Sequence, residues 1–96
     1  MINIAIYITD EIKLYDIYED VVYYSIMKNE LFDIFRFSNY SEFKSFVGTI
    51  GFDIIITDDE NITQSENYPV IIQSDVYSDE NLSDSVNIIK QQRRQV

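Results

Sequence analysis

Three short apolar runs constrain what this chain can fold into more than any other feature of its sequence. They occupy residues 2–8, 52–57 and 69–73, and each holds no more than one strongly polar side chain. Strands of this composition are typical of parallel sheets that are buried on both faces. Because both faces must be covered, we expect a layered α/β structure of about four mainly parallel strands and about three helices. The first two runs should be adjacent at its centre.

The segments between these strands carry apolar residues at helical spacing. This spacing predicts a helix at about residues 10–27, and Asn39 opens a second helix that Gly51 is placed to end. A further strand is expected at 31–37, and a last helix begins at residue 78 or 79. The predicted order is therefore β-α-β-α-β-loop-β-α.

The connection between the last two strands is too short for a covering helix. Residues 58–67 are polar apart from Ile62, whereas a parallel crossover normally takes a dozen or more residues. We therefore expect the strand at 69–73 either to run antiparallel to the strand at 52–57 or to cross over in a tight loop at the sheet edge. Part of one sheet face would then stay exposed as an interface, unless the final helix closes it.

The length of 96 residues allows one domain. We place an α/β domain at residues 1–90 and a polar, basic tail at 91–96, where nothing is left to bury. No apolar run is long enough to cross a bilayer, and no basic segment precedes an apolar stretch at the N-terminus. These features predict a cytoplasmic protein without a membrane partner.

Several residue types on which enzymes depend are missing. The chain has no Cys and no His, so neither a thiolate nucleophile nor a hydrolytic triad of the usual kind can be built. Its two glycines, Gly48 and Gly51, cannot form a glycine-rich phosphate loop. We expect no catalytic residues and no enzyme activity.

The charge of the chain points to a basic partner. The 17 acids and 7 bases give a net charge of −10, and residues 1–89 alone carry −13. Eight acids and no base lie between Asp58 and Ile89. Such a surface repels phosphate backbones, which argues against direct binding of DNA or RNA. It attracts a basic protein surface, for example that of a nucleic-acid-binding protein.

Acidic and hydroxyl side chains are expected to gather at the carboxyl edge of the sheet, where parallel α/β sheets bind ligands. The residues that follow the predicted strands there are Asp10, Ser38, Asp58, Asp59, Glu60, Ser74 and Asp75. Several converging carboxylates would suit Mg²⁺, which prefers oxygen ligands. Alternatively the edge is a partner-binding face. Its charge would then come from Asp58, Asp59 and Glu60, and its apolar anchors would be Ile62, Tyr68 and Tyr77.

Four stretches of the chain, MINIAI, LFDIFRFSNYSEF, FDIIITDDEN and PVIIQS, resemble a response-regulator receiver domain. The most similar form is the one found in front of LytTR-type DNA-binding domains, and the resemblance covers roughly residues 1–90. It implies a small flavodoxin-like sheet in which Asp58 accepts a phosphoryl group and Ser74 contacts it. It also implies bound Mg²⁺, for which Asp10 and Asp59 are the candidate ligands.

Three departures separate the chain from that family. Ile8 and Thr9 stand at the positions of the acidic pair that binds Mg²⁺ in receivers. Lys90 is the one candidate for the lysine of the family's fifth strand, and it follows Ser74 too closely. The third crossover helix has no counterpart. The chain is therefore similar to a shortened and degenerate receiver.

Three functions remain open from the sequence. The first is a non-catalytic regulatory module that binds a basic protein partner through an acidic face. The second is an acidic inhibitor from a phage or mobile element that mimics the charge of nucleic acid. The third is a phosphoacceptor receiver that uses Asp58. The small size and the acidic body favour the first two.

Overall fold

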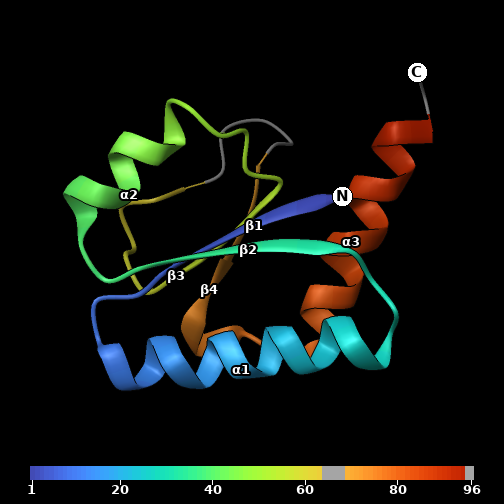
Figure 1. Ribbon diagram of the computed structural model, residues 1–96, viewed down its shortest axis with the longest axis horizontal. Coiled ribbons are helices and arrows are strands. Elements are labelled where there is room, and N and C mark those ends of the chain that lie inside the picture. Colours follow the sequence, from blue (N-terminus) through green and yellow to red (C-terminus); the bar gives the residue numbers. More distant parts are fainter. Residues whose placement is uncertain (64–68, 95–96) are drawn as a thin grey trace.

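A four-stranded parallel sheet lies at the centre of the computed structural model, which describes residues 1–63 and 69–94 (Figure 1). The strands follow the order β2-β1-β3-β4 across the sheet, and every neighbouring pair is parallel. Their bounds are Ile2–Tyr7 for β1, Phe32–Phe37 for β2, Ile54–Thr57 for β3 and Val70–Gln73 for β4. The predicted α/β class is confirmed, and β1 and β3 occupy the two central positions, as expected.

Helices cover both faces of this sheet. α1 (Glu11–Met27) and α3 (Asp79–Arg94) pack against one face, and α2 (Tyr40–Val47) packs against the other (Figure 1). The α1 side of the core contains fully buried isoleucines of the two central strands, namely Ile4, Ile6, Ile54 and Ile56. The α2 side is mainly aromatic and contains Tyr7, Phe37, Phe43 and Phe52. None of the helices in the described part of the chain is long and apolar enough to span a membrane.

Each helix begins at a polar side chain that caps its first turn. Asn39 Oδ1 accepts a hydrogen bond from the backbone N–H of Glu42 (3.1 Å), and Ser78 Oγ accepts one from Asn81 (3.1 Å). These caps pair N–H groups that have no partner within the helix. α2 is one turn shorter than predicted, because Gly48 rather than Gly51 is its C-cap.

β4 runs parallel to β3, so the antiparallel alternative is wrong. Because β4 begins at Val70, the connection spans residues 58–69 and reaches the dozen residues that a parallel crossover takes. The described start of this connection lies on the α2 side of the sheet, because Ile62 packs with the aromatic cluster there. The right-handed crossover rule favours the same side, since the step from β3 to β4 has the direction of the step from β2 to β3. The described residues of this connection contain no helix, as predicted.

The final helix does not cover the sheet face that the missing crossover helix leaves open. α3 packs beside α1, on the opposite face. On the α2 side, Ile71 of β4 is half-buried. A groove of about 240 Å³ remains there, lined by Val47, Ile50, Gly51, Phe52, Ile55 and Pro69.

α3 continues through Arg94, so residues 91–94 of the expected polar tail are helical. Residues 95 and 96 lie outside the described residues. Two ion pairs explain why the helix extends beyond its last buried apolar residue, Ile89. Lys90 pairs with Glu30, and Arg93 pairs with Asp53 at 3.1 Å.

Candidate functional site

The carboxylate of Asp58 is held by Thr9 at the carboxyl edge of the sheet. Asp58 directly follows β3, and Thr9 comes two residues after β1, which is the neighbouring strand. The backbone N–H of Thr9 lies 3.2 Å from each carboxylate oxygen, and its hydroxyl donates to Oδ2 at 2.9 Å. The candidate phosphoacceptor is therefore at the predicted edge. Both of its carboxylate oxygens accept hydrogen bonds from the neutral residue Thr9.

Each of the two candidate metal ligands accepts hydrogen bonds from backbone N–H groups two or three residues after it in the chain. Asp10 caps α1, since its Oδ1 accepts hydrogen bonds from Ile12 (3.0 Å) and Lys13 (3.3 Å). Asp59 Oδ1 accepts a hydrogen bond from the backbone N–H of Asn61 at 2.9 Å. Within residues 1–63 and 69–94, no three acidic side chains lie close enough together to hold a metal ion. The Mg²⁺ site stays a prediction.

Ser74 lies beside α1. It begins a short 3₁₀ turn, Ser74–Val76, that directly follows β4. A cavity of about 250 Å³ is lined by Ser74 together with Lys13, Asp16, Ile17 and Asp75. Lys13 is thus the base that lines the same cavity as the candidate phosphoryl contact, and the sequence did not single it out.

Tyr7 is a further residue of this edge that the sequence did not single out. Its ring stacks on Phe43 with 4.8 Å between the ring centroids. Burial raises the pKa of the Tyr7 hydroxyl above its usual value, and the charges of Asp59 and Asp58 raise it further. The sequence marks Tyr7 only as a residue of the first apolar run. Its position as the last residue of β1 is the signal that could have placed it at the edge.

The apolar anchors proposed for the partner-binding face do not form one patch. Ile62 packs with the α2-side cluster, whereas Tyr77 packs with the core on the α1 side. Tyr68 lies outside the described residues. Glu60 is exposed, and Asp58 and Asp59 are half-buried. The acidic residues of the predicted face therefore lie together after β3, whereas Ile62 and Tyr77 lie on opposite sides of the sheet.

Topology adds more acids to this edge, because α1 and α3 both begin there. We call the following set the acidic edge: Asp10, Glu11, Asp58, Asp59, Glu60, Asp75, Asp79 and Glu80. The opposite edge, where both helices end, carries Lys28, Lys90, Arg93 and Arg94. The charge of the molecule is thus polarised along the strands.

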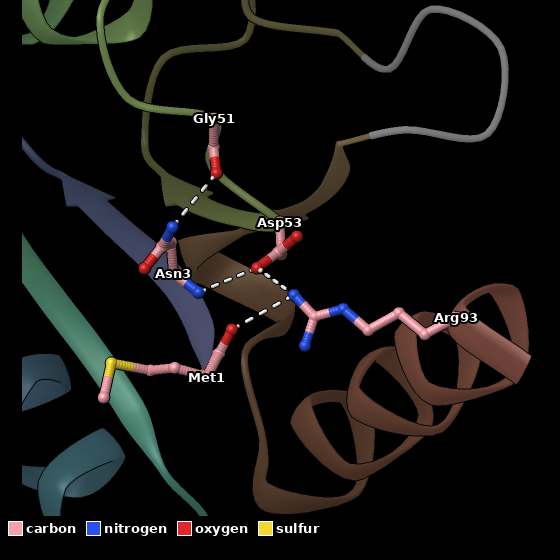
Figure 2. A network of polar contacts seen from close by, with 5 residues as sticks. All are labelled: Met1, Asn3, Gly51, Asp53 and Arg93. Carbon is pink, nitrogen blue, oxygen red and sulfur yellow. Dashed lines mark hydrogen bonds and ion pairs between the residues drawn. The ribbon is translucent and has the colours of Figure 1, made fainter.

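A polar network closes that opposite edge of the sheet (Figure 2). The buried carboxylate of Asp53 accepts a hydrogen bond from the backbone N–H of Asn3 (2.8 Å) and lies 3.1 Å from Arg93 Nη2. Arg93 also donates to the Met1 carbonyl oxygen at 3.1 Å, and Asn3 Nδ2 donates to the carbonyl of Gly51 at 3.3 Å. All these contacts are internal, so the network attaches the end of α3 to the sheet.

The fold and the acidic edge together define a small flavodoxin-like α/β domain, whose four-stranded parallel sheet carries acidic residues at its carboxyl edge. No model of a known protein family matches the chain, and no curated protein or solved structure is significantly similar to it.

Proposed function

We propose that this protein is a non-catalytic, receiver-like regulatory module that binds a basic protein surface through its acidic edge. The observation that carries the proposal is the bonding of Asp58 to Thr9, which leaves a fixed negative surface at this edge. Two neighbouring carboxylates would repel each other unless a cation came between them. A carboxylate paired with a threonine has no such requirement.

The distribution of charge supports a basic partner. The acidic edge combines the loop after β3 with the first turns of α1 and α3, so the fields of its carboxylates add. Single exposed ion pairs are worth only about 0–1 kcal/mol. Several such charges accelerate encounter with an oppositely charged surface, and salt weakens this effect.

The test is the association rate of a partner recovered by pull-down from the organism that encodes the protein. Asp59→Asn combined with Glu60→Gln should slow association several-fold at low salt and change dissociation little. Asp58 is left unchanged because its bonds to Thr9 join the ends of β1 and β3. Surface plasmon resonance over a salt series measures both rates.

The matched control is Asp33→Asn combined with Asp84→Asn, which removes the same charge from exposed positions away from the acidic edge. This pair should slow association clearly less than the edge pair. Equal effects of both pairs, or an association rate that does not depend on salt, would remove the acidic edge from the mechanism.

The same protein and its captured partner also test the two alternative functions. If the protein mimics nucleic acid, then DNA or RNA will compete with it for the captured partner. If Asp58 is a live phosphoacceptor, then acetyl phosphate with Mg²⁺ will add a phosphoryl mass that Asp58→Asn abolishes. The position of Asp58 directly after β3 is what favours this third function.

A further inference from the structure

The solvent-facing side of α1 carries large apolar side chains among its charged ones. Leu14, Ile17 and Val21 face the core. On the other side four large side chains are exposed: Ile12 by 76%, Tyr15 by 54%, Tyr23 by 63% and Ile26 by 70%. A surface helix of a globular protein normally carries polar residues on that side, and a helix that is apolar all round is normally buried. The large apolar side chains exposed on α1 are therefore candidates for a contact surface.

These exposed residues lie in a strip on one side of the helix, in two pairs that Glu19 separates. Ile12 is three residues before Tyr15 and Tyr23 is three before Ile26, and Glu19 lies four residues from both Tyr15 and Tyr23. We call Ile12, Tyr15, Glu19, Val22, Tyr23 and Ile26 the outer α1 face. A shallow groove of about 470 Å³ runs along most of it. In Figure 1, α1 lies at the outside of the molecule with the sheet on one side, and no described element lies beyond it.

The charges along this strip are negative. Glu19 and Asp20 line the groove, and no base does. The neighbouring carboxylate of Glu19 raises the pKa of the Tyr15 hydroxyl. Two bases lie close to the strip: Lys13 directly follows Ile12, and the guanidinium of Arg36 lies 4.2 Å from the centre of the Tyr18 ring. A partner that covers the strip must therefore bring apolar side chains together with positive charge.

We infer that the outer α1 face is the docking site for a basic amphipathic helix of a partner protein. The strip from Ile12 to Ile26 is about 21 Å long, which matches about four turns of a second helix. A helix with apolar residues at helical spacing and flanking Lys or Arg would fill the groove and pair with Glu19 and Asp20. A second copy of this chain fits poorly, because a two-fold contact would bring the same acids together.

This inference rests on the proposed function, because it specifies which apolar surface holds the basic partner. The acidic edge and the outer α1 face are continuous, since Glu11 belongs to the first and the next residue, Ile12, to the second. The edge would accelerate encounter, and the outer α1 face would supply the apolar contact that slows dissociation.

The experiment uses a synthetic helical peptide of leucine and lysine, about 18 residues long, with the leucines on one side. A second peptide of the same composition, with the leucines distributed all round, is the charge-matched control. Fluorescence anisotropy measures the Kd of both. We expect the amphipathic peptide to bind at least about tenfold more tightly than the control peptide.

The matched protein variants are Tyr23→Gln with Ile26→Gln, against Val76→Gln with Ile88→Gln. All four positions are exposed, and circular dichroism checks that the fold is kept. The α1 pair should weaken binding of the amphipathic peptide about tenfold or more, and the other pair should leave it within about twofold. Equal binding of both peptides, or equal effects of both variant pairs, would overturn the inference.

Three further outcomes separate this inference from the proposed function. If the Asp59 and Glu60 variant slows association of the natural partner but the α1 pair leaves its dissociation unchanged, then the proposed function stands and the inference fails. If sedimentation shows a dimer that the α1 pair abolishes, then the occupant is a second copy and the inference also fails. If the association rate of the natural partner depends neither on salt nor on the Asp59 and Glu60 variant, then the proposed function fails, irrespective of how the peptide binds.

Discussion

Thr9 determines what Asp58 can do at the carboxyl edge. A second carboxylate at this position would repel the charge of Asp58 unless a cation were bound. Thr9 instead donates hydrogen bonds to Asp58 from its backbone and its hydroxyl. The neighbour of Asp58 after β1 is thus a neutral hydrogen-bond donor rather than a second carboxylate.

The sequence predicted the place of Asp58 but not its partner. A run of isoleucines that ends in an acid is visible in the sequence. The contact with Thr9 depends on the register between β1 and β3, in which Tyr7 is opposite Thr57. No pattern within either strand specifies that register. The separation of Ile62 from Tyr77 has a similar origin, because the crossover path decides which face each side chain joins.

Tyr77 offers a test at the level of one atom. Its hydroxyl is buried, and no described residue forms a hydrogen bond with it. An unpaired buried hydroxyl costs about 1–3 kcal/mol. Tyr77→Phe should therefore raise the free energy of unfolding, by about 1 kcal/mol, in urea titrations at neutral pH. Tyr23→Phe, at an exposed position, is the control and should change it little. A destabilised Tyr77→Phe would show that the hydroxyl has a partner.

The same residue gives a pH dependence. Burial raises the pKa of Tyr77, and the charges of Asp79 and Asp20 add to this effect. A group whose pKa is raised by folding favours the folded state below its unfolded pKa, about 10 for tyrosine. Wild-type stability should fall as the pH rises above about 10, and the fall should be smaller in Tyr77→Phe.

Among the elements, α3 depends on charged partners that lie in other parts of the chain, namely Glu30 and Asp53. Its apolar pattern stops at Ile89, so the sequence predicted a tail from residue 91. The last turn is helical because Arg93 reaches Asp53 and the Met1 carbonyl, which belong to other parts of the chain. By contrast, the strands were predicted well because burial on both faces leaves a continuous apolar run.

Removal of the Arg93 charge should loosen this end of α3. Arg93→Gln leaves the buried carboxylate of Asp53 with the Asn3 N–H but without its cation. Breaking a fully buried pair costs about 3–5 kcal/mol. Because the Arg93 side chain is 47% exposed, we expect a loss nearer about 1–2 kcal/mol. Urea unfolding measures it, with Arg94→Gln as the control for the charge change. Equal losses in both variants would contradict a specific role for Arg93.

At the scale of the whole molecule, topology places many of the acidic residues at one edge of the sheet and most of the bases at the other. Helices favour acids in their first turn and bases in their last. α1 and α3 both run from the carboxyl edge to the opposite edge, so these preferences add. The sequence predicted Asp10 at the same edge as Asp58, Asp59 and Glu60, but the addition of Glu11 follows from the start of α1 at this edge and from the position of β1 beside β3. The same arrangement places the two observed ion pairs at the opposite edge.

This polarised charge predicts that salt stabilises the free protein. The net charge of −10 and the crowding of carboxylates at the acidic edge repel more strongly in the folded state than in the expanded one. Raising NaCl from 0.01 M to 0.15 M shortens the Debye length from about 30 Å to about 8 Å and screens this repulsion. The free energy of unfolding in urea should therefore rise over that range. Asp59→Asn with Glu60→Gln should show a smaller rise, because two of the repelling charges are gone. A stability that falls with salt would mean that the ion pairs of Lys90 and Arg93 outweigh the repulsion at the acidic edge.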